Sequence, residues 1–485
     1  MFMPNLAGSS IFSRAKEISS PKISTNIKVG PLLHYFFVSC PKLGAKEGFE
    51  QERVIFFHPA NDETINQGGI TGFSEAVFGF TENFVSGKLN CKSDLPPEYE
   101  HRYITTKNYN QIMIKVERGE FTIGISLKKD KCREADYFVH LPTIKAQLVT
   151  TYQLFKLFNG TFSDLLKKGL CKNVCAQFFL NYLNIMKLNF MPLVDLFNGV
   201  DMLPVIPQLL LTVERFISHL ENEFTNIDKI MFLYQDRLVW HSVYKDDLLI
   251  LFTYLTKSLL SASISDELQP ETFNCRRRTY KYGDGKFITG DSRTGQTPPK
   301  VFLTNKASDG SGLFVEPYYI VAFRCLNATI CLFFKEEPTG DMLDKLGHYF
   351  EQSLNQLASK IGSSVPLPNK ANYSEIPFHM IYYNPSTLSL STSFNQQGEN
   401  TSTMPNLTKS VLKLTCDTFD HFMAEKDEPF GHVQVKSEDG WYIYFKKFNA
   451  RIVILYLYDA NSTSLDKTET FAQIIKRNIS NMLLD

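Results

Sequence analysis

The sequence predicts a mixed α/β chain of the α+β kind, in which one order of elements occurs three times: two strands, a helix, three strands and a helix. Apolar strands lie next to short polar turns, and stripes of large apolar side chains at helical spacing follow them. The 485 residues are enough for about three domains at roughly 150 residues each. Each module is therefore expected to be a five-stranded, largely antiparallel sheet flanked by helices.

The first module is predicted over residues 31–190. Strands at 33–38 and 53–57 flank a charged turn, and His58-Pro59 ends the second strand because proline cannot extend a ladder. Four large apolar side chains then recur at helical spacing, which predicts a helix with these groups on one face: Phe73, Val77, Phe80 and Phe84.

Three more strands are predicted at 103–110, 112–117 and 121–127, with polar breaks at 109–111 and 118–120. A long helical stripe follows, and a further helix is predicted over 174–188. The stripe consists of Leu141, Ile144, Leu148, Tyr152, Phe155, Phe158, Phe162 and Leu165. A connection over 191–225 contains a helix at 206–224.

The pattern restarts in a second module, 226–362, and a third, 373–485. The second has a hairpin over 229–241, a helix, a long polar loop over 262–298, three strands and a closing helix. Its three strands are expected at 301–304, 318–325 and 329–334. The third repeats the order, with strands at 379–383, 388–394, 432–435, 441–448 and 453–458. Residues 1–30 show little periodicity and are expected to be a disordered tail.

Composition excludes some classes of function. Lysine plus arginine equals aspartate plus glutamate at 51 each, which removes the electrostatic argument for broad nucleic-acid binding. The amino-terminal residues lack an apolar signal region, and no uncharged run approaches the ~20 residues that cross a bilayer. The chain is expected to be cytosolic.

Candidate reactive groups are few. Of the nine cysteines only Cys171 and Cys175 lie close together, and we interpret them as buried thiols rather than a metal pair, because zinc needs further ligands. The segment 290–297 has phosphate-loop glycine spacing but Gln296 in place of lysine, so a plain loop is favoured. Asp246-Asp247 precedes a predicted helix, where helix capping is favoured. His58 is interpreted as structural, and no cofactor is expected.

Several motifs resemble the Ccz family of vacuolar fusion proteins, and the element order resembles three tandem longin domains. The motifs are Pro41-Lys42-Leu43-Gly44, Glu47-Gly48, Phe56-Phe57-His58-Pro59, Gly72-Phe73 with Glu75-Ala76-Val77 and Phe80-Thr81, the run Lys156-Leu157-Phe158-Asn159-Gly160-Thr161-Phe162, and Phe232-Leu233-Tyr234 with Asp236, Leu238 and Trp240. The match spans about residues 31–304, whereas the last third agrees mainly in pattern.

The resemblance implies a subunit of a guanine nucleotide exchange factor. Members of this family pair with Mon-family proteins and activate a late-endosomal Rab GTPase, so the implied partners are a Mon-family chain, a Rab, an anionic or phosphoinositide membrane and, in metazoan-type complexes, a third regulatory subunit. It also implies peripheral recruitment to late endosome, lysosome or vacuole membranes. The interface candidates carried by motif position are His58, Pro59, Gly72, Phe73, Glu75, Ala76 and Phe80.

Two alternatives stay open from the residues alone. The basic cluster Arg276, Arg277, Arg278 and Lys281 could contact an anionic membrane, although a solvated loop is favoured. A longin scaffold or adaptor in vesicle trafficking, without direct GTPase contact, would fit the same fold.

Overall fold

The computed structural model of the chain describes twelve stretches, which form two compact units. The stretches are 26–44, 48–60, 66–85, 99–260, 285–290, 297–306, 313–364, 377–394, 404–424, 431–460, 462 and 464–479. The amino-terminal unit consists of the described residues within 19–197 and 407–417, and the carboxyl-terminal unit of those within 198–406 and 418–485. Each unit is described by itself.

The amino-terminal unit contains a five-stranded antiparallel sheet in the order β3-β2-β6-β5-β4. Its strands are β2 (Leu33–Ser39), β3 (Val54–His58), β4 (His101–Thr105), β5 (Tyr109–Val116) and β6 (Phe121–Lys128). Almost every residue of β2 and β6 is buried, because both faces of this sheet are covered. Strand β2 thus lies inside the sheet although it comes first in the chain.

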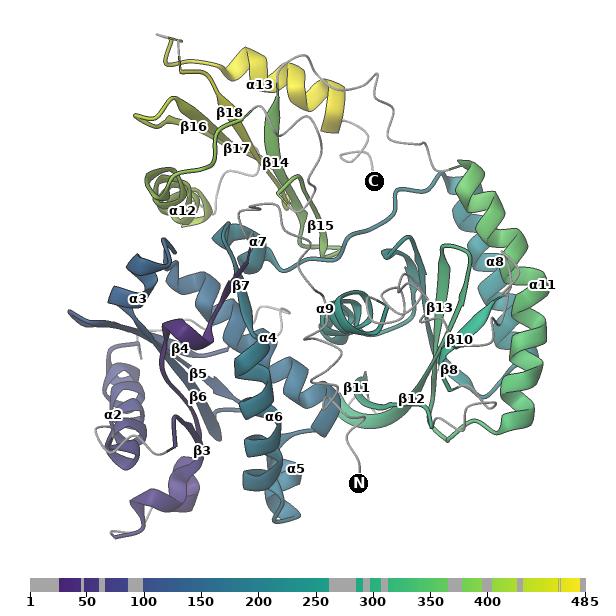
Figure 1. Ribbon diagram of the computed structural model, residues 1–485, viewed down its shortest axis with the longest axis horizontal. Coiled ribbons are helices and arrows are strands. Elements are labelled where there is room, and N and C mark those ends of the chain that lie inside the picture. Colours follow the sequence, from purple (N-terminus) through teal and green to yellow (C-terminus); the bar gives the residue numbers. More distant parts are fainter. Residues whose placement is uncertain are drawn as a thin grey trace, which may run out of the picture. The chain divides into compact units, whose positions relative to one another are not determined.

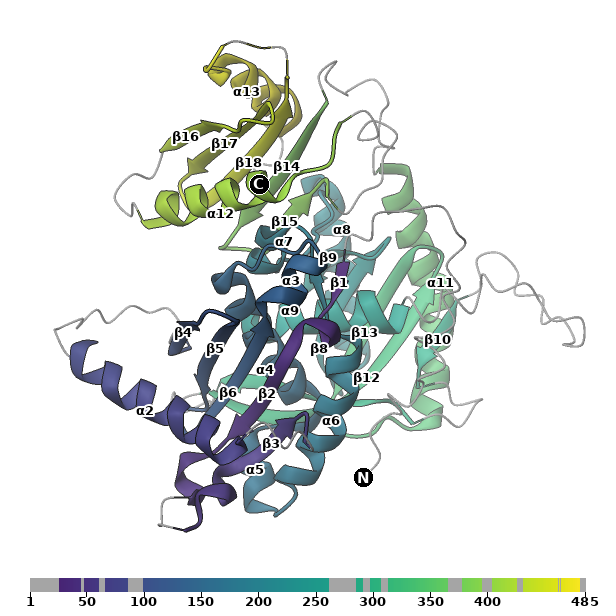
Figure 2. The same ribbon diagram turned by 60° about the vertical axis from the view of Figure 1, so that its left-hand side comes forward.

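Helices lie on both faces of this sheet (Figures 1 and 2). On one face is α2 (Gln67–Val85), and on the other are α4 (Leu141–Asn159) and α6 (Cys171–Ile185). A dense aromatic core fills the α4 and α6 side, where the Phe155 and Phe179 rings stack with centroids 5.4 Å apart. The smaller elements of this unit are β1 (Asn26–Lys28), α3 (Lys129–Glu134), α5 (Phe162–Lys167), β7 (Lys187–Asn189) and α7 (Pro192–Phe197).

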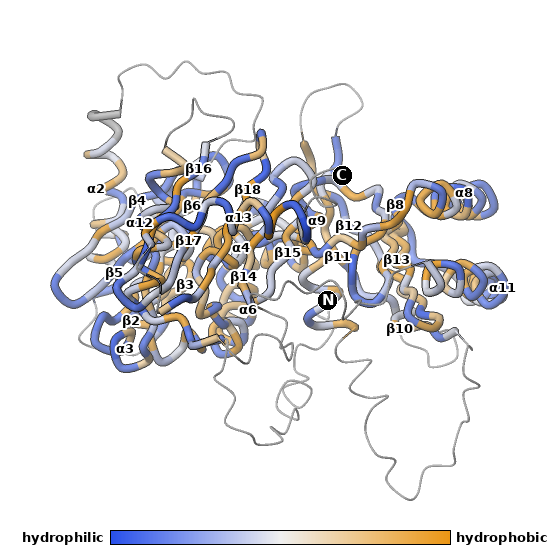
Figure 3. The backbone as a smooth tube through the Cα atoms, turned by 90° about the horizontal axis from the view of Figure 1, so that it is seen from above, coloured by the Kyte–Doolittle hydropathy of each residue, from blue (hydrophilic) through white to orange (hydrophobic). Residues whose placement is uncertain are grey.

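The carboxyl-terminal unit holds two more sheets. One has the order β10-β12-β13-β8-β9, with β11 also paired to β12. Its elements are α8 (Pro207–Glu223), β8 (Ile227–Tyr234), β9 (Arg237–His241), α9 (Lys245–Tyr254) continued by a π-helix (Leu255–Leu260), β10 (Lys286–Thr289), β11 (Lys300–Lys306), β12 (Leu313–Cys325), β13 (Ala328–Phe334) and α11 (Gly340–Ser364). Helices α8 and α11 turn their apolar sides to this sheet and their polar sides outward (Figure 3).

The other sheet has the order β15-β14-β18-β17-β16. Its elements are β14 (Phe378–Asn384), β15 (Ser389–Thr392), β16 (His432–Lys436), β17 (Trp441–Phe448), β18 (Arg451–Tyr458), α13 (Thr468–Ile474) and a π-helix (Ile475–Ile479). The helix α12 (Lys409–Ala424) is divided at residue 417, so its first half belongs to the amino-terminal unit. Phe471 and Ile474 of α13 are buried against Tyr442 and Leu455 of this sheet.

All three sheets follow one path. When the strands are numbered by their order within a module, they run 2-1-5-4-3 across each sheet. In the second module two short strands, β10 and β11, take the place of strand 3, and both pair with the 13-residue strand β12. The predicted fold class, three tandem longin-like modules with antiparallel sheets flanked by helices, is therefore confirmed. The expected five strands are found in the first and third modules, whereas the sheet of the second module has six.

A short segment, 198–203, joins the second and third sheets and is called the strap below. Val200 exchanges two backbone hydrogen bonds with β15, from its N–H to Leu388 O (2.7 Å) and from Leu390 N–H to its carbonyl (2.9 Å). On its other side the strap bonds β9, from Leu238 N–H to Asp201 O and from Leu203 N–H to Leu238 O, both 2.8 Å. A side chain at Gly199 would lie 2.3 Å from Leu390 Cβ, so only glycine fits there.

Several predicted boundaries were wrong. The predicted tail 1–30 includes β1, and the predicted loop 262–298 includes β10; residues 1–25, 261–284 and 291–296 lie outside the described residues. The first turn of the β4-β5-β6 meander falls at 106–108 rather than 109–111, because Thr106 closes it through its N–H and hydroxyl to Tyr109 O. The long helix ends at Gly160 (φ 80°), after which Thr161 caps α5.

Candidate partner-binding face

The helix α2 rests on its sheet mainly through Phe78, and Ile70 and Val77 pack against the same cluster. Phe78 is 2% exposed and lies in a small cluster with Tyr35, Phe37, Phe57 and Met113. Among the described side chains of α2, those of residues 67–81, Thr71 and Ser74 are also fully buried. Their hydroxyls donate to carbonyls of the same helix, so the helix approaches the sheet closely without leaving these hydroxyls unpaired.

The opposite side of α2 carries two large aromatic side chains toward solvent. Phe73 is 52% exposed and Phe80 is 66% exposed, and Ala76 between them is also exposed. The three residues lie three and four positions apart, and therefore on one side of the helix, which we call the α2 face. The face predicted for Phe73, Val77, Phe80 and Phe84 is only partly correct. Phe73 and Phe80 point away from the sheet, Val77 packs against the Phe78 cluster, and the side chain of Phe84 lies outside the described residues.

The first half of α2 is tied to the start of β3 by a partly buried ion pair. Arg53 Nη1 lies 3.2 Å from Glu75 Oε2, and the two side chains are 14% and 26% exposed. Arg53 Nη2 also donates to the carbonyl of Gly44 at 2.9 Å. Burial raises the pKa of Glu75 above its usual value, and the nearby guanidinium opposes that rise.

The second half of α2 is held from the other edge of the sheet. Arg102 on β4 donates to Thr81 Oγ1 at 2.5 Å and lies over the Phe78 ring, with its guanidinium carbon 5.1 Å from the centroid. The ammonium of Lys115 lies 4.8 Å from the same centroid. Two cations against one buried ring fix the point where α2 crosses the sheet.

The structure brings most of the predicted interface residues together. Gly72, Phe73, Glu75, Ala76 and Phe80 all belong to α2. His58 ends β3, as predicted, and burial lowers its pKa; the following peptide bond to Pro59 is cis. The basic residues Arg276, Arg277, Arg278 and Lys281 lie outside the described residues, so their membrane role stays a prediction.

Sequence reasoning missed two residues next to this face. Arg53 was assigned only to a strand, although a cation that opens an otherwise apolar strand is a signal for a buried partner. Phe49 precedes it in the turn and is 52% exposed. The Phe49 carbonyl and Arg53 both lie 3.0 to 3.1 Å from where a Gly44 side chain would begin, so a side chain there would fit only if these neighbours moved by a few tenths of an ångström.

The other constellations have structural roles. Cys171 and Cys175 are buried, as predicted, with their Sγ atoms 3.9 Å apart. Asp246 and Asp247 lie in the first turn of α9, where negative charge complements the helix dipole. The carboxylate of Asp247 also accepts from the Thr304 N–H (2.5 Å) and hydroxyl (3.1 Å) and ties α9 to β11. Across the stretches that the structure covers, no three His, Cys, Asp or Glu side chains are grouped as metal ligands would be.

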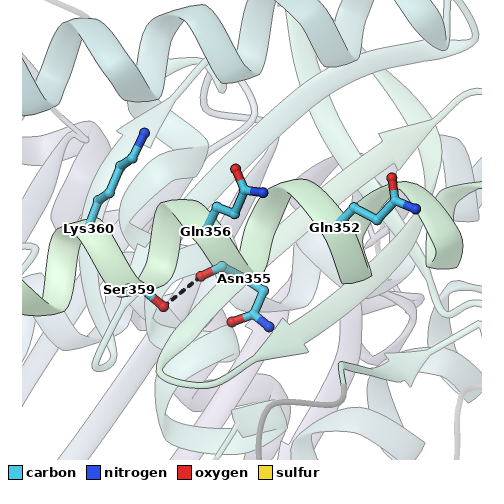
Figure 4. A pocket seen from close by; sticks show the side chains of 5 residues that line it. All are labelled: Gln352, Asn355, Gln356, Ser359 and Lys360. Atoms are coloured by element: carbon cyan, nitrogen blue, oxygen red, sulfur yellow. Dashed lines mark hydrogen bonds between the residues drawn. The ribbon is translucent and has the colours of Figure 1, made fainter.

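A shallow depression lies on the outer surface of α11 (Figure 4). It is lined by Gln352, Asn355, Gln356, Ser359 and Lys360, and the Ser359 hydroxyl donates back to the Asn355 carbonyl at 2.9 Å. All five residues come from one helix, which leaves the depression without an opposing wall of polar groups. We therefore take the α2 face, and not this depression, as the candidate functional site.

None of the helices formed by the described residues is both long and apolar enough to span a bilayer.

Comparison with known proteins agrees with the fold. Residues 33–160 match the family described as the first longin domain of INTU, CCZ1 and HPS4, and residues 227–358 match the Intu longin-like domain 2 family. These matches cover the strands of the first and second sheets, with α2 and α4 in the first range and α9 and most of α11 in the second. The class is thus that of proteins built from tandem longin domains.

Full-length relatives narrow the class. The chain is 26% identical over 480 residues to the vacuolar fusion protein CCZ1 homolog of Nematostella vectensis, a match that covers 94% of this chain and 98% of the relative. The homolog of Xenopus tropicalis is 24% identical with the same coverage, and that of Dictyostelium discoideum is 25% identical over 90% of this chain and 94% of its own length. The chain belongs to the CCZ1 family of vacuolar fusion proteins. This membership supports a role in vacuolar fusion and membrane trafficking.

Proposed function

We propose that this chain is one subunit of a heterodimeric guanine nucleotide exchange factor. It pairs with a Mon-family protein through its first longin domain, and the pair activates a late-endosomal Rab GTPase in endosome and vacuole maturation. The third subunit and the membrane contact expected from the family resemblance belong to the same proposal, as does recruitment to late endosomal or vacuolar membranes.

The observation that carries the proposal is the α2 face. Two phenylalanines at 52% and 66% exposure on one helix side are unusual on a free surface, and aromatic side chains are enriched where protein partners bind. The face lies in the domain that matches the first longin domain family. Its aromatic and small side chains suit a mainly apolar partner surface.

The proposed activity requires contacts rather than reactive groups. An exchange factor must bind the nucleotide-free GTPase more tightly than the loaded form, and by linkage it weakens nucleotide binding by the same factor. Each tenfold weakening requires about 1.4 kcal/mol of differential contact. Displacement of the switch loops and the magnesium ion of the GTPase would supply that difference.

The test has two stages. This chain is co-expressed with a Mon-family chain, and release of a fluorescent GDP analogue is measured on a panel of purified Rabs. We expect one Rab to respond to the complex and none to this chain alone. Fast release by the isolated chain would overturn the shared site, and a stable complex inactive on every Rab would favour the adaptor alternative.

A double variant tests the face itself. Phe73→Ser with Phe80→Ser should weaken complex formation at least tenfold, because two apolar contacts are lost while the buried Phe78 stays in place. The matched control is Leu211→Ser on α8, where a leucine is similarly exposed at 56%. Unchanged complex formation by the double variant would remove the α2 face from the interface.

A further inference from the structure

The intrinsic helix propensity of α2 is low. Its 19 residues include four glycines, at 68, 69, 72 and 79, and glycine is among the least favourable residues inside a helix. Its buried contact is the small cluster around Phe78. Contacts with the sheet must therefore supply much of what keeps α2 helical and in place.

Two arginines supply such contacts, one from each edge of the sheet. Arg53 precedes β3 and reaches Glu75 in the first half of α2, while Arg102 on β4 reaches Thr81 in the second half. The Thr81 hydroxyl in turn donates to the Val77 carbonyl at 2.7 Å, so the arginine is coupled to the helix backbone. Phe78 lies between the two attachment points along the helix.

We propose that Arg53 and Arg102 are positioning residues, which hold the two halves of α2 and so set how well the α2 face binds its partner. The inference rests on the proposed function for the identity of that partner. The effect on α2 itself does not depend on it, and can be measured on this chain alone.

The surroundings of Arg53 are built for a guanidinium. Its two terminal nitrogens point to different elements, Nη1 to Glu75 and Nη2 to the Gly44 carbonyl, which only a forked side chain can do. A side chain at Gly72 would begin 3.2 Å from Nη1, so the helix passes Arg53 at a position with no side chain.

The Arg53–Glu75 contact also holds spare hydrogen-bonding capacity. Arg53 Nε and Glu75 Oε1 are both buried, and neither has a hydrogen-bond partner among the described residues. One hydrogen bond joins the pair where two could form. The attachment of α2 to Arg53 therefore depends on one hydrogen bond between these side chains, without a second one to support it.

Hydrogen exchange on the full-length chain tests the inference. Arg53→Met should speed exchange of the backbone amides of 71–78 at least tenfold, and Arg102→Met should do the same for 78–81, because each variant releases one half of α2. Arg53→Lys should fall in between, since lysine keeps the charge but not the fork. Glu75→Gln keeps an acceptor for Arg53 and should stay within about threefold of the unmodified chain.

The matched control is Lys131→Met on α3. This change also removes a cation from an ion pair, but Lys131 and Glu134 are 45% and 63% exposed, so exchange in α2 should stay within twofold. Unchanged α2 exchange in Arg53→Met and Arg102→Met would overturn the inference. If Arg53→Met also speeds exchange of the β5 and β6 amides, the variant has loosened the whole sheet, and Arg53→Lys becomes the test. In that case, α2 amides of Arg53→Lys that exchange within twofold of the unmodified chain would overturn the inference.

Binding to a purified Mon-family chain gives the second readout. Arg53→Met should weaken binding at least fivefold although it leaves Phe73 and Phe80 in place. If the Phe73→Ser, Phe80→Ser variant binds normally while Arg53→Met still loosens α2, the proposed function fails and the positioning role stands. If the double phenylalanine variant loses binding and Arg53→Met binds normally, the positioning role in binding fails and the proposed function stands.

Discussion

The helices α2 and α9 occupy the same place in two modules, directly after the second strand, but differ in what they do with their apolar side chains. In α9, Leu248, Ile250, Leu251 and Phe252 are all buried. Among the described apolar side chains of α2, Phe78 alone is fully buried, and Phe73 and Phe80 face solvent. One topology therefore serves two purposes: α9 completes a core, whereas α2 offers a surface.

The hydrogen bonds that attach the two helices also differ: those of α9 are more buried than those of α2. Asp247 of α9 is 4% exposed and accepts two hydrogen bonds from Thr304. Glu75 of α2 accepts one hydrogen bond from Arg53, and its side chain is 26% exposed. A helix held by partly exposed ties opens more easily than one held by buried ties.

The largest expected effect separates the two sides of α2. Phe78→Ala should lower the free energy of opening of α2 by about 3 kcal/mol or more, because it empties the cluster on which the helix rests. Phe73→Ala should change it by less than about 0.5 kcal/mol, since that ring is half exposed. Native-state hydrogen exchange measures both, and equal effects would contradict the assignment of the two sides.

The next effect concerns α9. Asp247→Ala should destabilise the attachment of α9 to β11 by about 2 to 3 kcal/mol, because the buried N–H and hydroxyl of Thr304 lose a charged acceptor. The measurement is exchange of the α9 and β11 amides. Glu351→Ala on α11 removes a carboxylate that is 52% exposed and should have almost no effect; a similar loss in both variants would argue against a special role for Asp247.

A smaller effect should make α2 more like α9. Gly79→Ala should stabilise α2 by about 1 kcal/mol, because nothing lies within 4 Å of the added methyl group and alanine favours the helix. Gly72→Ala adds the same methyl group 3.2 Å from Arg53 Nη1 and should gain less. Circular dichroism and exchange of the α2 amides compare the two, and an equal gain would show that Arg53 can move aside.

The smallest effect is a pH dependence. Burial raises the pKa of Glu75 above 4.5, so the folded chain holds this proton more tightly than the unfolded chain. The stability that this proton contributes is complete below pH 4.5 and is lost as the pH rises through the raised pKa. Glu75→Gln should therefore flatten the fall in α2 stability over that window. An identical slope in both chains would show that Glu75 does not titrate with folding.

Much of the fold could be predicted from the sequence, since hydrophobic period separates strands from helices over long stretches. The closing helix α11 and the strands β13 and β18 fall within a few residues of the predicted ranges. Short elements could not be predicted in this way. The strands β1 and β10 have three and four residues and are defined by their partners, β7 and β12, which lie far away in the sequence.

The direction of the α2 face shows a second limit. Spacing correctly placed Phe73 and Phe80 on one side of the helix, but spacing cannot say whether that side meets the sheet. Among the described residues, the fully buried part of the sheet side is made by Thr71, Ser74 and Phe78, with Ile70 and Val77 packed beside them. Thr71 and Ser74 are polar, and their hydroxyls bond to their own helix. A contact made by small side chains gives a weak hydrophobic signal, and the strong signal came from the exposed side.

The strap has a consequence for how the chain behaves at high concentration. Edge strands present unpaired backbone groups on which strands of other molecules can add, and this is a common start of aggregation. At Leu238 on β9, at Leu390 on β15 and at Leu388 just before β15, those groups are already bonded to residues 200–203. One short segment thus blocks growth from two sheets at once, and the fit of Gly199 against Leu390 makes this protection sensitive to a single added methyl group.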